Sequence, residues 1–261
     1  TLEIFDKGEV IRSYTSKKPE KKNSWPGGPG SELILIKKEG FNRIHWDFRR
    51  APVPAVNKVF VYGSYEGSRV GPGNYTARLT YGEEQQETTL TVLPNPKIEA
   101  SQADFDEQQK LLVEIDNTLG DIHNAVTRMR NIQMQLQHYG EVLKGKKEFL
   151  AVLDKAKTIE KKLKAWELKL IQPKQKTFQD VINFNNKLNA EWMYLKSFVD
   201  SDDPKVTQGA KDRFQDLMEQ WKTNEKELNA IIEVDFEAFE SLYRSMEVPA
   251  LLIQETKHEA L

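Results

Sequence analysis

The sequence contains no cysteine in its 261 residues. This absence excludes disulfide bonds, thiolate zinc sites and cysteine nucleophiles together. It leaves the compartment open, because a cysteine-free protein folds in oxidising and reducing surroundings alike. No apolar run approaches the roughly 20 residues that a membrane-spanning helix needs, so we expect no membrane span.

The sequence also lacks an excess of charge of one sign. Its 38 basic and 40 acidic side chains leave a formal net charge of −2. Nucleic-acid binders and anionic-membrane binders usually carry a strongly basic face. Lysines cluster in residues 144–164, but no stacking aromatics are interleaved with them, so a solvated helix face explains them. We therefore expect no nucleic-acid partner.

Common catalytic and metal-binding motifs are absent as well. The sequence has no G-x-S-x-G elbow, no P-loop, no G-x-G-x-x-G and no H-E-x-x-H. The four histidines, His45, His123, His138 and His258, do not have the spacing of the three or four ligands that zinc requires. We therefore expect neither a metal nor another cofactor.

Carboxylates are plentiful, but their positions do not indicate catalysis. Glycoside hydrolysis usually needs two carboxylates about 5–10 Å apart in a cleft. Nearly all acids here fall on predicted outer helix faces or in turns. Asp235 and Glu240 interrupt an apolar stretch, and we interpret them as solvated or ion-paired. The sequence therefore predicts no catalytic residue.

A change of hydrophobic period near residue 96 organises the chain. Before it, apolar residues alternate with polar ones, as Tyr75, Ala77 and Leu79 do in a predicted antiparallel strand. Roughly seven short strands separated by turn signals predict an immunoglobulin-like or fibronectin type III-like β-sandwich over residues 1–96. The clearest predicted strands are 2–5, 10–14, 33–36, 44–48, 59–62, 74–81 and 87–92.

After residue 96, apolar residues recur every three or four positions. Ser101 and Asp104 have the spacing of a capping box, so a first helix is expected over about 101–140. Two more are expected over about 146–170 and 177–199. Asp203-Pro204 would cap a fourth that ends before Pro249. Short connections between them predict an antiparallel bundle of about four long helices over residues 97–261.

The predicted class is thus a two-domain protein, all-β followed by all-α. Six residues are expected in the cores of the two domains: Trp46, Tyr75, Leu79, Trp166, Trp192 and Trp221. The chain opens on Thr1 inside a predicted strand, without a methionine or a leader, which favours a fragment of a longer protein.

One segment of the strand half resembles a known pattern. GFNRIHWD at residues 40–47 and VGPGNYT at residues 70–76 resemble G-x-N-x-x-x-W-D followed by P-G-x-Y. That pattern belongs to immunoglobulin-like modules of flagellar hook-capping proteins and of bacterial secreted enzymes. The resemblance implies that Trp46 and Tyr75 are packing residues and that Gly73 meets a backbone requirement.

A second resemblance covers essentially the whole chain. NFNNKLN at residues 183–189, EQWKTNEKEL at 219–228, DFEAFE at 235–240 and VPA at 248–250 carry it. They resemble the C-terminal region of large, secreted, bacterial sortilin-like or BNR-repeat β-propeller proteins, commonly labelled glycosyl hydrolases. In that family a propeller precedes an immunoglobulin-like module and a helical tail. No Asp-box of the form S-x-D-x-G-x-x-W occurs here, so the propeller itself is absent.

The resemblance implies a non-catalytic C-terminal structural or interaction region of a secreted, periplasmic or cell-surface bacterial protein. Its partner would be the N-terminal β-propeller of the parent chain. A second hypothesis is a carbohydrate-binding accessory module with polysaccharide as its partner. A third hypothesis is an autonomous glycoside hydrolase. No motif in the sequence indicates the cleft with convergent polar groups that such an enzyme needs.

Trp25 is the main candidate for binding a sugar. It stands in a loop without strand periodicity, where an exposed indole could stack on a sugar ring beside Tyr62 or Tyr65. The alternative is that Trp25 packs against the helical half or the propeller, because aromatic residues are favoured at interfaces.

Overall fold

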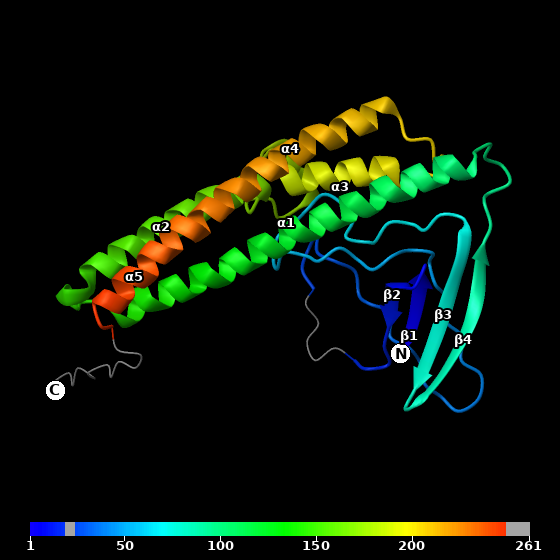
Figure 1. Ribbon diagram of the computed structural model, residues 1–261, viewed down its shortest axis with the longest axis horizontal. Coiled ribbons are helices and arrows are strands. Elements are labelled where there is room, and N and C mark those ends of the chain that lie inside the picture. The colour runs from blue at the N-terminus through cyan, green and yellow to red at the C-terminus, as the bar shows by residue number, and fades with distance from the viewer. Residues whose placement is uncertain (19–23, 249–261) are drawn as a thin grey trace.

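A long helix and a small sheet dominate the computed structural model, which describes residues 1–18 and 24–248. Helix α1, Gln102–Val142, runs along most of the molecule (Figure 1). The sheet lies beside the N-terminal part of α1, and helices α2 and α5 lie along its C-terminal part (Figure 1). Both ends of the elongated body are therefore connected through one helix.

The sheet is a single antiparallel layer with strand order β2-β1-β3-β4. Lys7 and Gly8, both with positive φ, form the tight turn of the first hairpin. Gly82, also with positive φ, opens the two-residue turn of the second hairpin. The strands are β1, Leu2–Asp6; β2, Glu9–Tyr14; β3, Gly73–Tyr81; and β4, Glu84–Val92.

The predicted two-domain class with a β-sandwich is wrong. In the described residues the predicted strands at 33–36, 44–48 and 59–62 are irregular segments, so no second sheet faces the first. Only isolated bridges occur outside the four strands, between Thr15 and Ile34 and between Arg49 and Arg69.

The segment 53–65 packs on helices instead of forming part of a second sheet. Val59, Phe60 and Val61 are all buried, whereas a strand with one solvated face would bury every second residue. Four backbone carbonyls of residues 54–66 accept hydrogen bonds from side chains rather than from a neighbouring strand. The acceptor and donor pairs are Pro54 with His123, Asn57 with Arg130, Val59 with Trp25, and Glu66 with Lys196.

The start of α1 follows the predicted capping box. Ser101 accepts a hydrogen bond from the backbone N–H of Asp104, whose carboxylate accepts one from the backbone of Ser101. Helix α2, Leu150–Leu170, also lies where a helix was expected, after a 3₁₀ turn at Lys147–Phe149. Local signals in the sequence therefore predict the positions of both helices.

The predicted bundle of four long helices is wrong in its second half. Helix α3 covers only Leu188–Val199, because Phe178–Ile182 forms a separate 3₁₀ turn. Helix α4, Gln208–Ala230, is capped by the Thr207 side chain and not by the expected Asp203. It continues through a π-helical turn at Ile231–Phe236 into α5, Glu237–Ser245. None of the helices in the described residues is long and apolar enough to cross a membrane.

The main hydrophobic core crosses the predicted domain boundary at residue 96. Val53, Val56, Val59 and Val61 from the N-terminal half belong to the same buried cluster as the helices. A smaller cluster under the sheet contains Ile4, Ile11, Val70 and Tyr75. The N-terminal half therefore does not bury a separate core large enough to replace its contact with the helices.

Candidate functional site

Trp25 contacts its own chain on several sides. Its side chain is half-buried, and Nε1 donates a hydrogen bond to the carbonyl of Val59 at 2.8 Å. A Cβ atom at Gly28 would lie only 2.6 Å from the indole, so the backbone at Gly28 rests against the ring. One ring face is thus covered, which removes part of the surface that a sugar would stack on.

The two tyrosines predicted beside Trp25 lie in different surroundings. Tyr62 is 56% exposed and packs edge-on against Phe178, with ring centroids 5.5 Å apart. Tyr65 is buried in the main core beside His123, and burial raises the pKa of its hydroxyl to about 12. Phe178, which is 58% exposed, is the aromatic neighbour that the sequence analysis missed, because it lies more than 100 residues away in the sequence.

Most of the residues expected in the cores are buried. Trp166, Trp192 and Trp221 lie in the main core, and Tyr75 lies in the cluster under the sheet. Trp46 is half-buried against that cluster and donates from Nε1 to the carbonyl of Arg49 at 2.9 Å. Leu79 is 51% exposed, so its assignment to the core is corrected.

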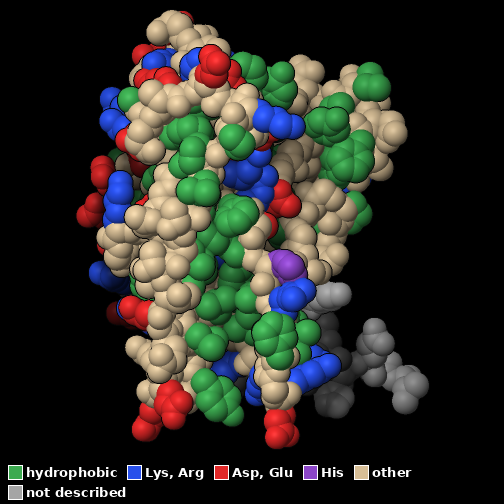
Figure 2. Space-filling model, turned by 90° about the vertical axis from the view of Figure 1, so that its right-hand side faces the viewer, with side chains coloured by type: hydrophobic (Ala, Val, Ile, Leu, Met, Phe, Trp, Pro, Cys, Tyr) green, Lys and Arg blue, Asp and Glu red, His purple; other side chains and the backbone are tan. Residues whose placement is uncertain are grey.

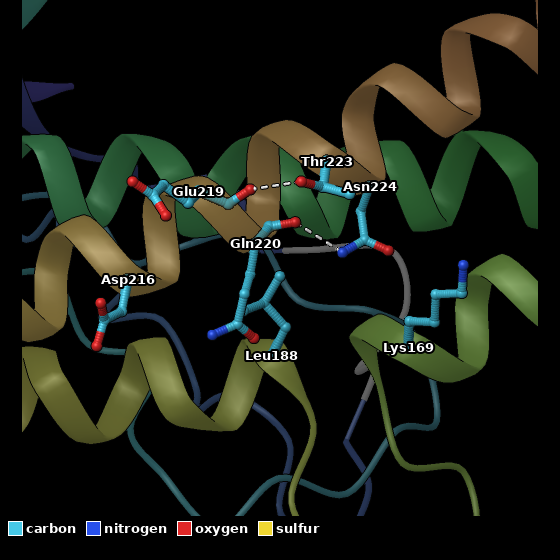
Figure 3. Close-up of a pocket in the computed structure, with 7 residues that line it drawn as sticks. All are labelled: Lys169, Leu188, Asp216, Glu219, Gln220, Thr223 and Asn224. Carbon is cyan, nitrogen blue, oxygen red and sulfur yellow. Dashed lines mark hydrogen bonds between the residues drawn. The ribbon is translucent and has the colours of Figure 1, made fainter.

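A polar groove of the helical part lies between α2, α3 and α4 (Figure 3). Its volume is about 520 Å³, and Leu188 is the apolar member of its lining. Figure 3 shows that Asp216 and Glu219 point away from Lys169 on the opposite wall. Lys169 itself forms an ion pair with Glu227 at 2.5 Å. The two carboxylates do not converge on a common point, as a glycosidase pair would.

A smaller hollow of about 280 Å³ lies between the first hairpin and the segment 29–33. The Arg12 guanidinium lies over the ring of Tyr14, 4.9 Å from its centroid, and 3.4 Å from Glu32. His45 and Asp47 also contribute polar groups to the lining of this hollow. The hollow is smaller than the roughly 300–1,000 Å³ of ordinary small-molecule sites. Its charges already neutralise one another in part.

Asp235, singled out by the sequence, is ion-paired. Lys155 and Lys162 of α2 approach its two carboxylate oxygens at 3.0 and 2.6 Å. The hydrogen bond from Lys162 is the main cause that lowers the pKa of Asp235. Glu240 pairs with Arg244 at 3.1 Å. Within residues 1–18 and 24–248, no group of three or more acids and histidines is arranged to hold a metal ion.

A buried polar junction joins the N-terminal half to α1 and α3. Asp116 of α1 accepts hydrogen bonds from Ser68, from the backbone N–H at 3.0 Å and from Oγ at 2.6 Å. Lys196 of α3 lies 2.7 Å from the other carboxylate oxygen of Asp116 and donates to the carbonyl of Glu66. Both charges are largely removed from water, with side-chain exposures of 14% and 5%.

A second set of ion pairs extends this junction to the end of α3. Arg49 donates to the carboxylate of Asp200 at 2.9 Å, and Arg69 donates to the backbone carbonyl of Asp200 at 2.6 Å. Arg69 also pairs with Asp202 at 2.6 Å. These charges hold the irregular segment 49–69 against the helices. Their geometry indicates a structural role.

His123 of α1 faces the same segment and is completely buried. Its Nδ1 lies 2.6 Å from the carbonyl of Pro54, and Nε2 lies 3.5 Å from the side-chain amide of Asn189. Burial, assisted by the charge of Lys196, lowers the pKa of His123 to about 4. The imidazole is therefore neutral near pH 7, and it donates from Nδ1 to the Pro54 carbonyl.

Apolar side chains of β3 and of the irregular segment 44–48 are, in contrast, exposed to solvent. Leu79, Tyr81 and Phe48 are 51%, 76% and 52% exposed. The half-buried Trp46 lies beside Phe48, with ring centroids 5.3 Å apart, and packs on the same cluster as Leu90. We call these five residues the open face. Figure 2, which views the sheet end of the molecule, shows a band of hydrophobic side chains between two more polar ridges.

No family model, no curated protein and no solved structure matches this chain. The resemblance to sortilin-like proteins therefore stays a prediction. The secreted or periplasmic location, the propeller partner and the absence of a nucleic-acid partner stay predictions for the same reason.

Proposed function

We propose that this chain is a non-catalytic interaction region, in which a rigid helical body presents the open face of the sheet to another polypeptide. The observation that carries this proposal is the exposure of Leu79 and Tyr81 on the inner face of β3. They share that face with the buried Tyr75, where a sandwich would place a second sheet. Contiguous exposed apolar surface commonly marks a binding site for another protein.

The distribution of charged groups supports the same proposal. The largely buried carboxylates of Asp116 and Asp235 are neutralised by lysines and join separate elements. Neither lies free in a hollow with a second acid at catalytic distance. The resemblance in the sequence favours one partner, the N-terminal β-propeller of a longer parent chain.

The non-catalytic assignment predicts no turnover of a panel of chromogenic glycosides by the intact chain, because the carboxylates do not converge. Release of the chromophore is measured by absorbance over a range of pH. Turnover that disappears on substitution of a single carboxylate, such as Asp216→Asn or Glu32→Gln, would show that the chain is an enzyme.

The open face should contribute little to the stability of the chain itself. Tyr81→Ser should change the free energy of unfolding by no more than about 0.5 kcal/mol, as for other exposed positions. Tyr75→Ser, six residues away on the same face of β3, is the matched control. It should cost several times more, because Tyr75 is buried and its hydroxyl donates to Gly71 at 2.7 Å.

Urea unfolding followed by circular dichroism measures both variants. A loss from Tyr81→Ser as large as that from Tyr75→Ser would mean that Tyr81 serves the fold, and the open face would lose its main support as a binding surface.

Carbohydrate binding remains the second candidate, because Tyr62 and Phe178 both expose aromatic surface and pack against each other. Their rings lie nearly perpendicular, at 83°, so only one of them at a time can stack flat on a sugar. Retention of the chain in a polysaccharide affinity gel, lost on Tyr62→Ala but kept on Tyr81→Ser, would favour this candidate over the first.

A further inference from the structure

The free edge of β4 has the features of a site for strand addition. β4 pairs with β3 only, over nine residues and without a register shift, and in the described part of the chain nothing pairs with its other edge. Figure 1 shows β4 as the outer strand of the sheet. An edge of this kind offers a row of backbone donors and acceptors to another extended segment.

The hairpin register identifies which backbone groups face outward. Tyr81 and Glu84 flank the two-residue turn, so they exchange hydrogen bonds with each other. From that pair onward, every second residue of β4 directs its N–H and C=O toward β3. The residues between them direct theirs away from the sheet: Gln85, Glu87, Thr89 and Thr91.

This edge lacks the devices that usually protect an edge strand. Proteins commonly block such edges with proline, lysine or a β-bulge. β4 has the sequence EQQETTLTV, with no proline and no lysine, and its pairing with β3 is regular. The remaining protection is acidic charge, which repels acidic partners but attracts basic ones.

Charge and surface chemistry together define the occupant. Residues 79–96 contain Glu83, Glu84 and Glu87 but neither lysine nor arginine. Glu87 pairs with Arg78 at 2.6 Å, whereas Glu83 and Glu84 lie in no ion pair within the described residues. A strand added beside β4 would place alternate side chains on the inner side of the sheet, next to Leu90 of the open face, and the others on the outer side, next to Glu87.

We propose that the β4 edge binds an extended segment of another polypeptide by β-strand addition, with apolar residues alternating with basic ones. The apolar side chains lie on the inner side of the sheet beside Leu90, and the lysine or arginine side chains lie on the outer side beside Glu87, toward the turn that carries Glu83. This inference rests on the proposed interaction function and specifies the chemistry of the partner.

The test uses a synthetic peptide of about ten residues in which lysine and valine alternate, with both termini blocked. Matched control peptides replace valine with proline, which keeps the charge but cannot form a strand, or lysine with glutamate. Binding to the intact chain is measured by calorimetry. Amide hydrogen exchange, measured by NMR, locates the site.

The exchange pattern is the decisive readout. In the free chain the amides of Gln85, Glu87, Thr89 and Thr91 exchange fast, and those of Gln86, Thr88 and Leu90 exchange slowly. The lysine–valine peptide should slow the outward set by at least about tenfold, as expected for newly formed backbone hydrogen bonds. The inward set should change little, and the control peptides should leave both sets unchanged.

Two variants test the contacts separately. Thr89→Pro removes one outward N–H and should weaken binding by about tenfold, whereas Thr89→Val keeps that N–H and should leave binding unchanged. If Thr89→Pro fails to fold by circular dichroism, the double variant Glu83→Lys/Glu87→Lys tests the charge instead. It leaves the ladder intact and should also weaken binding by about tenfold.

The possible results separate this inference from the proposed function. Protection of amides elsewhere, or equal binding of the proline control, would overturn strand addition but leave an interaction role in place. Absence of binding by every peptide overturns the inference. Dimerisation of the chain with protection of the outward β4 amides would show that a second copy, and not a basic partner, occupies the edge. Glycosidase turnover would overturn the proposed function itself.

Discussion

Lys196→Met should destabilise the chain by about 3–5 kcal/mol, because it leaves the Asp116 carboxylate without its charged partner in a largely buried site. The same substitution also removes the donor to the Glu66 carbonyl, which lies in the irregular segment between the sheet and the helices. The free energy of unfolding in urea measures this loss.

Lys211→Met is the matched control for Lys196→Met. Lys211 pairs with Glu107 at 2.5 Å, but both side chains are well exposed, at 38% and 50%. The loss in the control should stay below about 1 kcal/mol, the usual contribution of an exposed ion pair. Equal and small losses in both variants would show that the junction does not hold the two halves together.

The stability of the chain should fall as the pH is lowered through the titration of His123. The pKa of His123 is about 4 in the folded chain and 6.5 in the reference state, so between these values the unfolded chain binds a proton that the folded chain does not. The contribution of neutral His123 to the free energy of unfolding is therefore complete above about pH 7. It decreases by about 2 kcal/mol at pH 5 and by about 3 kcal/mol at pH 4.

His123→Gln separates this effect from the titration of carboxylates. Glutamine can still donate to the Pro54 carbonyl but does not titrate, so the variant should lose less stability than the wild type between pH 7.5 and pH 5. Urea unfolding at the two pH values gives the comparison. Identical pH dependence of the two proteins would mean that His123 is accessible to protons in the folded chain.

The parts of the fold that follow from local sequence could be predicted. The hairpin of β3 and β4 is encoded by alternation on both sides of Gly82, and the start of α1 by Ser101 and Asp104. In both cases the determining residues lie within a few positions of the element that they form. The residues that indicate the hairpin or the helix start are therefore the same residues that form it, and a short stretch of sequence is enough to predict it.

The loss of the second sheet could not be predicted in the same way. Val59, Phe60 and Val61 have the composition of a strand, but a short apolar run does not show what covers it. Here the helices cover it, and Arg130 and His123 supply hydrogen bonds that a neighbouring strand would otherwise have made. This is a tertiary contact without a local signal.

The open face exists because no second sheet covers β3 in the described residues. The alternation of Tyr75, Leu79 and Tyr81 predicts an apolar face, but only the fold shows that it is buried at Tyr75 and exposed at Tyr81. A weak signal for the polar junction was present, because Lys196 lies between Trp192 and Val199 on the apolar side of α3. A lysine at such a position commonly has a specific buried partner.

Native-state hydrogen exchange tests most directly whether the sheet and the helices form one structural body around a shared core. Measured at increasing low concentrations of denaturant, it gives an opening free energy for each slow amide. The slowest amides of β1 and β3 should open with the same free energy as those of α1 and α3, and Lys196→Met should lower all of them equally. Sheet amides that open several kcal/mol more easily than helix amides, and that do not respond to Lys196→Met, would contradict the account.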